Sequence, residues 1–188
     1  MRALLGLAGR IDAATRLLAR FAGALIVALV LVGAFNAILR TVDAEFGTGL
    51  SSNRWLELQW YLFSIAFLLG GPWALSVGAH VRVDVLHERF PRKLAAWIDL
   101  LGTLFLLIPF CLFVLWACWD AVLDSWRVLE VSNDPDGLPR YPIRTVPMIA
   151  FALMLFQAFA EAIKRVAFLR GLGGEELLGT SQNVEAGT

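Results

Sequence analysis

The residues that could do chemistry within the most apolar parts of this chain are three carboxylic acids, Glu57, Asp99 and Glu161. An ionisable group inside a membrane is costly and is a default candidate for an ion, proton or substrate site. All three acids lie toward the ends of their apolar stretches, whereas an ion or proton site is expected near the midplane. For Asp99 and Glu161 we therefore expect a partner such as Lys164 or Arg165, or access to interfacial water.

The histidines and cysteines suggest no cofactor site. His80 and His87 share one short segment, so they cannot face each other from two helices as paired haem ligation requires. With Asp84 they would give zinc at most three ligands, and no cysteine is near. Cys111 and Cys118 are seven positions apart on one helix face, too far for a disulfide, and are expected to pack as small apolar residues. Since nucleotide-binding, nucleophile-elbow and metalloprotease motifs are also absent, we expect no enzyme and no catalytic, metal or cofactor residues.

The elements that position these groups are long apolar stretches. The chain of 188 residues is 59% hydrophobic and 17% charged, and its mean hydropathy is +0.69. A membrane-spanning helix needs about 20 mostly apolar residues, and the segments between the stretches are too short for a soluble core. We therefore predict an all-α integral membrane fold, with one four-helix domain over residues 1–170 and a flexible cytoplasmic tail over 171–188. The predicted spans are 21–39, 55–77, 94–119 and 145–163.

The distribution of charge predicts the orientation. The formal net charge of zero excludes the basic balance of a nucleic-acid binder. Eleven cations fall on the side that carries both ends of the chain, against five on the other, and the positive-inside rule places the eleven in the cytoplasm. The eleven are Arg2, Arg10, Arg16, Arg20, Arg82, Arg89, Arg92, Lys93, Lys164, Arg165 and Arg170.

Residues 1–20 carry too many charges to insert but have helical periodicity. Leu4, Leu7, Ile11 and Leu18 recur on one face, and the arginines gather on the opposite one. We expect an amphipathic helix lying in the inner interface, with a solvated helical lead-in as the alternative.

Several motifs together resemble the small permease (DctQ-like) subunit of tripartite ATP-independent periplasmic (TRAP) transporters. They begin with Trp-Leu-Glu-Leu-Gln-Trp-Tyr-Leu-Phe at 55–63, Leu-Leu-Gly-Gly at 68–71 and Gly-Ala-His-Val-Arg-Val-Asp-Val-Leu at 78–86. Trp-Ile-Asp-Leu-Leu-Gly at 97–102, Gly-Leu-Pro-Arg-Tyr-Pro at 137–142 and the ending at 163–170 are similar to the branch labelled mannitol or chloroaromatic compound transport. The resemblance covers roughly residues 10–170.

This resemblance implies a division of labour between chains. A large membrane subunit would carry the substrate and sodium sites, and a periplasmic substrate-binding protein would deliver an organic acid. The present chain would support the large subunit in the bacterial inner membrane, among phospholipids, with no cofactor of its own. Two other hypotheses remain open: an autonomous four-helix transporter using Glu57 as a proton site, and the membrane anchor of a redox complex.

The resemblance also suggests a docking surface for the binding protein. Arg140, Tyr141 and Arg144 lie on a proline-stiffened segment on the outer side, and arginine and tyrosine are enriched at interface hot spots. The alternative is that Arg140 pairs with Asp134 or Asp136 and Arg144 anchors the last span at the headgroups.

Two further sets of residues are candidates for contact with the large subunit or with lipid. The first set is Glu57, Gln59 and Trp60, at the outer start of the second span, where Glu57 either makes a specific polar contact or pairs locally with Arg54. The second set is His80, Arg82 and Asp84, in the cytoplasmic loop, with self-packing of that loop as the alternative.

Overall fold

The computed structural model describes residues 1–78 and 91–172, and the regular elements in these ranges are helical. In chain order they are α1 (Arg2–Phe46), α2 (Asn53–Ser76), α4 (Arg92–Gly102), a short π-helical segment η1 (Thr103–Leu107), α5 (Ile108–Arg127) and α6 (Tyr141–Leu169). Because α4, η1 and α5 follow without a break, four helical segments are long and apolar enough to cross a membrane. The predicted all-α fold with four spans is confirmed.

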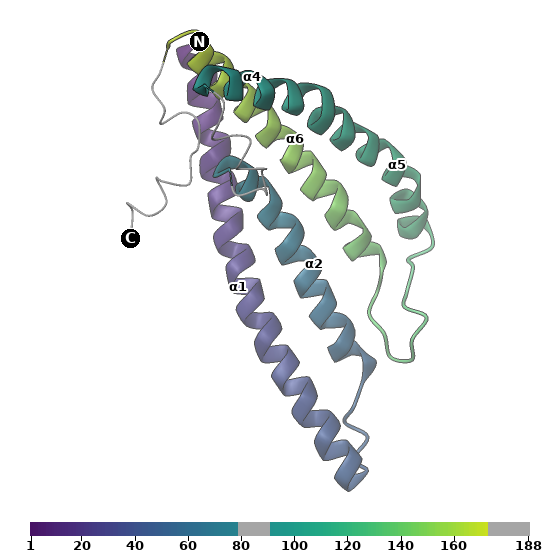
Figure 1. Cartoon of the computed structure of the whole chain (residues 1–188). Helices are drawn as coiled ribbons and strands as arrows, with labels where there is room; N and C mark the ends of the chain where they lie inside the picture. The colour runs from purple at the N-terminus through teal and green to yellow at the C-terminus, as the bar shows by residue number, and fades with distance from the viewer. Residues whose placement is uncertain (79–90, 173–188) are drawn as a thin grey trace.

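Helix α6 is the common packing partner, since it contacts α1, α2, α4 and α5. Figure 1 shows the starts of α1 and α4 beside the end of α6, at what we call the amino end of the bundle. We call the opposite end, with the connections over 47–52 and 128–140, the hairpin end. The buried charged side chains described below lie at these two ends, and the apolar length of the helices separates them.

Helix α1 packs along its length through small side chains spaced by multiples of seven. Its buried residues are Ala8, Thr15, Ala22 and Asn36. Positions seven apart in a helix lie on almost the same face, so these residues form one narrow stripe toward the rest of the bundle. Ala22 belongs to the apolar core, with Ala66 and Leu69 of α2.

The amphipathic helix expected over residues 1–20 is not a separate element. Those residues are the first part of α1, which continues without interruption into the first span (Figure 1). Leu4 and Leu7 of its apolar face remain 46% and 50% exposed. Ala8 and Thr15 extend the buried stripe of α1, and Thr15 is within hydrogen-bond distance of Gln157 on α6, so this segment continues along the axis of the span.

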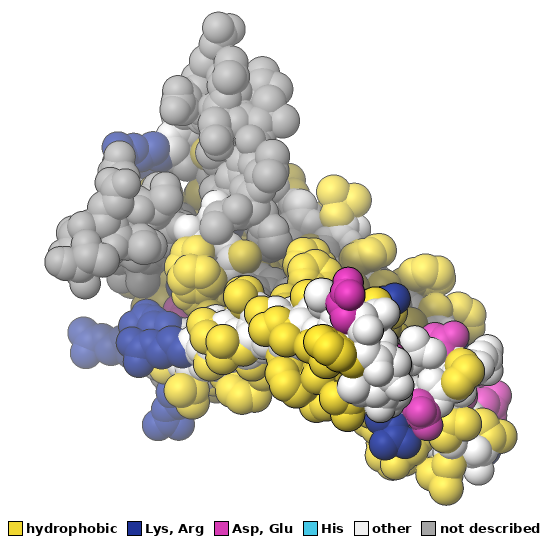
Figure 2. Space-filling model, turned by 90° about the horizontal axis from the view of Figure 1, so that it is seen from below, with side chains coloured by type: hydrophobic (Ala, Val, Ile, Leu, Met, Phe, Trp, Pro, Cys, Tyr) yellow, Lys and Arg dark blue, Asp and Glu magenta, His cyan; other side chains and the backbone are white. Residues whose placement is uncertain are grey.

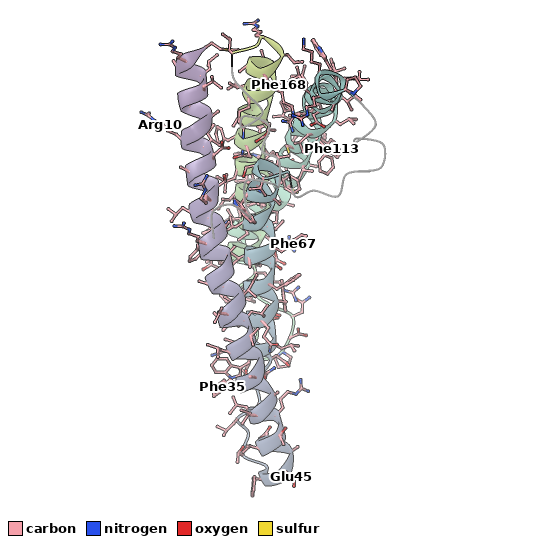
Figure 3. All side chains as sticks on the ribbon, turned by 60° about the vertical axis from the view of Figure 1, so that its left-hand side comes forward. Arg10, Phe35, Glu45, Phe67, Phe113 and Phe168 are labelled. Carbon is pink, nitrogen blue, oxygen red and sulfur yellow. The ribbon has the colours of Figure 1, made fainter. Side chains whose placement is uncertain are left out.

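Much of the remaining surface is apolar, as expected for a chain in lipid. Figure 2, which views the molecule from below, shows mostly hydrophobic side chains, with acidic ones toward the hairpin end and a group of basic ones on the left. Figure 3 shows apolar side chains such as Phe35, Phe67 and Phe113 projecting from the helices. Because so little of each span is buried within the chain, lipid or another subunit must cover these faces.

Candidate functional site

The first polar group of the structure, at the hairpin end, is centred on Glu57. This residue lies in the first turns of α2 and is only 2% exposed. The hydroxyl of Ser132 donates to its Oε1 and the backbone N–H of Leu138 donates to its Oε2. A buried carboxylate needs such donors, because burial without them costs far more than the hydrogen bonds return. Glu57 therefore fastens the 128–140 connection to α2, and we call Glu57, Ser132, Gly137, Leu138 and Arg140 the Glu57 cluster.

The same connection is held by contacts on either side of Glu57. The Tyr61 hydroxyl donates to the carbonyl of Pro139 at 2.9 Å, and the Asn53 side chain donates to that of Pro135 at 3.2 Å. Arg54 donates from Nε to the carbonyl of Asp136 at 2.9 Å. It pairs with the Asp136 carboxylate at 4.0 Å, so the local Glu57–Arg54 pair considered from the sequence is not the arrangement found.

Gly137 is required where the connection turns against Glu57. A Cβ atom at this position would overlap the Cβ of Ser132 and lie 3.0 Å from Glu57 Oε2. Glycine is thus the one residue that lets the backbone approach this closely.

The candidate docking residues hold the connection in place. Arg140 Nη2 lies 3.3 Å from the Ser132 hydroxyl, beside Glu57, rather than against Asp134 or Asp136. Its Nε is buried without a hydrogen-bond partner. Arg144 forms a 2.7 Å ion pair with Glu130 while 44% of its side chain stays exposed.

Aromatic contacts place two more of the candidates. The ring of Tyr141 packs edge-on against Trp126 at 4.7 Å. Trp60 is 42% exposed and packs edge-on against Tyr61.

The amide of Gln59 faces α1 from α2. Gln59 Nε2 donates to the carbonyl of Trp55 at 3.2 Å, and its Oε1 would lie 3.3 Å from a Cβ at Gly33. The other candidates, His80, Arg82 and Asp84, lie outside the described residues.

A hollow of about 520 Å³ opens beside the Glu57 cluster. Its lining combines the apolar side chains Trp55, Leu58 and Leu138 with the Arg54–Asp136 pair. Both charged side chains are more than half exposed, at 62% and 73%. The hairpin end therefore offers a concave surface with both signs of charge, held by a fastened backbone.

The second polar group of the structure lies at the amino end, where α1 and α6 meet. Lys164 Nζ lies 3.2 Å from Asp12 Oδ2 and forms an ion pair with Glu161. Gln157 Nε2 donates to Asp12 Oδ1 at 2.7 Å, and its Oε1 lies 3.2 Å from the hydroxyl of Thr15. These contacts lock the first turns of α1 onto α6.

Arg165 extends this group to α4. Its guanidinium lies 3.1 Å from Asp99 Oδ2 and 3.4 Å from Glu161 Oε2, with only 5% of the side chain exposed. The expected pairing of Asp99 and Glu161 with Lys164 and Arg165 is confirmed. We call the residues joined here the Glu161 cluster: Asp12, Thr15, Asp99, Gln157, Glu161, Lys164 and Arg165.

The sequence signals for Asp12 and Gln157 were present but were missed. Asp12 is the one acid among the arginines of residues 1–20, and Gln157 is a polar residue inside an apolar run. An isolated polar residue in such a setting indicates a buried partner.

Among the described residues, no group of three or more His, Cys, Asp or Glu could hold a metal ion. What both arrangements can do is hold backbone segments together, at two ends of an apolar layer.

Comparison with known proteins adds one match. The family model described as "Tripartite ATP-independent periplasmic transporters, DctQ component" matches residues 29–168, which is more than half of the chain. No curated protein and no solved structure matches the chain.

Proposed function

This chain belongs to the DctQ component family of tripartite ATP-independent periplasmic transporters, and from that premise we propose that it braces the large subunit of a sodium-driven importer of organic acids. Membership makes it the small membrane subunit of such a transporter, a multi-pass membrane protein and not an enzyme. A large membrane subunit and a binding protein are its implied partners. The brace role, the sodium gradient, the class of substrate and the bacterial inner membrane as its site are proposals.

The observation that carries the brace role is the absence of charged residues from the middle of every span. No Asp, Glu, Lys, Arg or His occurs in residues 21–39, 58–77, 100–119 or 145–160. A coupled transporter places its ion and substrate sites near the midplane. We therefore assign those sites to the large subunit, and to this chain the task of supporting it.

The amino end fits the cytoplasmic side. Lysines and arginines gather at the start of α1, the start of α4 and the end of α6, and a cytoplasmic excess of Lys and Arg is the usual determinant of orientation. The hairpin end would then face the periplasm, where a binding protein arrives.

Reconstitution tests the brace role. The chain should copurify with the large subunit, and proteoliposomes that hold both should import an organic acid when binding protein and an inward sodium gradient are supplied. Uptake by this chain alone would make it an autonomous transporter, and failure to copurify would end the brace proposal.

The docking surface proposed for the binding protein is the hairpin end, including Arg140, Tyr141 and Arg144. Preorganisation supports this assignment, because a backbone that is already fastened loses little entropy on docking. Arg144 is the more accessible of the two arginines, because 44% of its side chain is exposed whereas Arg140 is turned toward Ser132.

A charge swap tests docking without breaking the loop. Arg144→Glu together with Glu130→Arg keeps the ion pair but reverses its charges, so it should weaken the affinity of the binding protein for the assembled complex. Arg127→Glu together with Asp124→Arg is the matched control, because this exposed pair lies 2.9 Å apart and its swap likewise keeps an ion pair while reversing its charges. Unchanged affinity in the swap, with intact assembly, would remove Arg144 from the docking surface.

A further inference from the structure

The third helical segment, which begins with α4, is longer than a membrane span requires. The helical segment Arg92–Arg127 has 36 residues, whereas about 20 are enough to cross the hydrocarbon core. The 20 residues 100–119 carry no Asp, Glu, Lys, Arg or His and are enough for the crossing. Most of α4, residues 92–99, is therefore free to do something other than cross the membrane.

The chain changes direction where α4 meets α5. The π-helical segment η1 lies at this point, and Thr103 donates its hydroxyl to the carbonyl of Asp99 at 2.8 Å. Pro109 follows two residues after η1, and π segments and prolines are both established causes of bends. In Figure 1, α4 runs across the amino end before the helical segment bends and descends as α5. Figure 3 shows this part of the ribbon nearly end-on.

One face of α4 is fixed to α6. Ala95, Ala96 and Leu100 are buried, and the Asp99–Arg165 ion pair ties the helix to α6. Small side chains allow the two helices to approach closely.

The other face of α4 is apolar and has no partner within the described chain. Leu94, Trp97, Ile98 and Leu101 are 43–51% exposed, at the i, i+3, i+4, i+7 spacing of one helix face. This face continues into Leu104 and Phe105, which are also exposed at the start of the span. Lys93 is exposed at the beginning of the same helix.

We propose that α4 lies along the membrane surface at the amino end, with its Leu94–Leu101 face in the headgroup–acyl boundary and Lys93 near lipid phosphates. An apolar stripe with a tryptophan and flanking cations is the composition of an interfacial helix. Continuity with the lipid-facing surface of α5 favours phospholipid over protein as the occupant. With the amino end in the cytoplasm, the lipids would be those of the anionic inner leaflet.

Depth measurements on the assembled complex test this placement, and they do not depend on transport. In a Cys111→Ala, Cys118→Ala background, single spin labels are placed through Leu94→Cys, Trp97→Cys, Ile98→Cys and Leu101→Cys, with the complex in nanodiscs of phosphatidylcholine and phosphatidylglycerol. Phe113→Cys is the control on α5, and Ala96→Cys is the control for the buried face. Collision with oxygen and with a water-soluble nickel chelate gives the depth of each label.

A surface helix should give labels at one shallow depth from 94 to 101, accessible to oxygen, with the label at 113 distinctly deeper. A depth that rises by about 1.5 Å per residue, or roughly 10 Å over seven residues, would mean that α4 crosses the membrane. Labels shielded from both reagents would mean that the large subunit covers this face. Either outcome overturns the proposal while leaving the brace role intact.

The lipid-phosphate contact has its own test. Lys93→Gln should move the label at 94 toward water, whereas Arg170→Gln should not. An unchanged depth at 94 in Lys93→Gln would remove the phosphate contact from the proposal.

Discussion

The two polar clusters bury carboxylates of similar exposure but hold different things together. Glu57 and Glu161 are each 2% exposed. Glu57 is satisfied by a hydroxyl and a backbone N–H from one connection, whereas Glu161 is satisfied by two cationic side chains of its own helix that also reach α1 and α4. Removing the Glu57 carboxylate should therefore release the 128–140 connection, whereas removing the Glu161 carboxylate should weaken the packing of α1, α4 and α6.

The difference follows from what surrounds each carboxylate. At the hairpin end the chain turns, so backbone N–H groups are available as donors. At the amino end the backbone donors are already used within helices, and only long side chains can reach across the gaps between them. Ion pairs between helices are therefore found at the amino end, and a fastened loop at the hairpin end.

The largest expected effect comes from removing the ammonium of Lys164. Lys164→Met leaves Asp12 and Glu161 without the cation between them, and breaking a buried pair in this way costs about 3–5 kcal/mol. The free energy of unfolding of the purified protein in detergent or lipid measures it. Arg170→Met, at an exposed position, is the control. If both variants lose equally little stability, the Glu161 cluster does not hold the helices.

Removing the charge of Glu57 should have a smaller and more local effect. Glu57→Gln replaces one acceptor by a donor next to Ser132 or Leu138, and hydrogen bonds to a charged group contribute about 1.5–3 kcal/mol. Amide hydrogen exchange should speed up over 130–140 and stay slow in α6. Faster exchange in all helices would contradict the local role of the Glu57 cluster.

Adding a methyl group to Gly137 should disturb the same loop by overlap. Gly137→Ala places a Cβ against Ser132, and an overpacked site costs about 1–3 kcal/mol. Gly23→Ala is the control, since nothing lies within 4 Å of a Cβ there. Limited proteolysis of the 128–140 connection measures the effect. Protection equal to that of Gly23→Ala would argue against this overlap.

The smallest effect is expected at the rim of the hollow. Arg54 and Asp136 are mostly exposed and 4.0 Å apart, and such surface pairs contribute ~0–1 kcal/mol. Arg54→Gln should therefore leave the unfolding free energy almost unchanged. A loss comparable to that of Glu57→Gln would show that the carbonyl contact of Arg54, rather than its ion pair, fastens the loop.

The sequence by itself determined the number of helices and the placement of charge at their ends. Four apolar stretches of sufficient length leave few alternatives, because only helices or closed barrels satisfy backbone groups in lipid. The pairing of Glu161 and Asp99 with Lys164 and Arg165 was also predictable. The i,i+3 and i,i+4 spacings put Glu161 beside both cations on one helix.

Only the tertiary structure decided which distant segments these groups join. Glu57 meets Ser132 and Leu138 across 75 and 81 positions, and Asp12 meets Lys164 across 152. Local periodicity carries no information about such contacts. It also did not show that residues 1–20 continue into the first span, with Leu4 and Leu7 outward and the small residues Ala8 and Thr15 buried. In a membrane protein the larger apolar side chains can face lipid, so close approach of backbones, rather than hydrophobicity, selects the buried face.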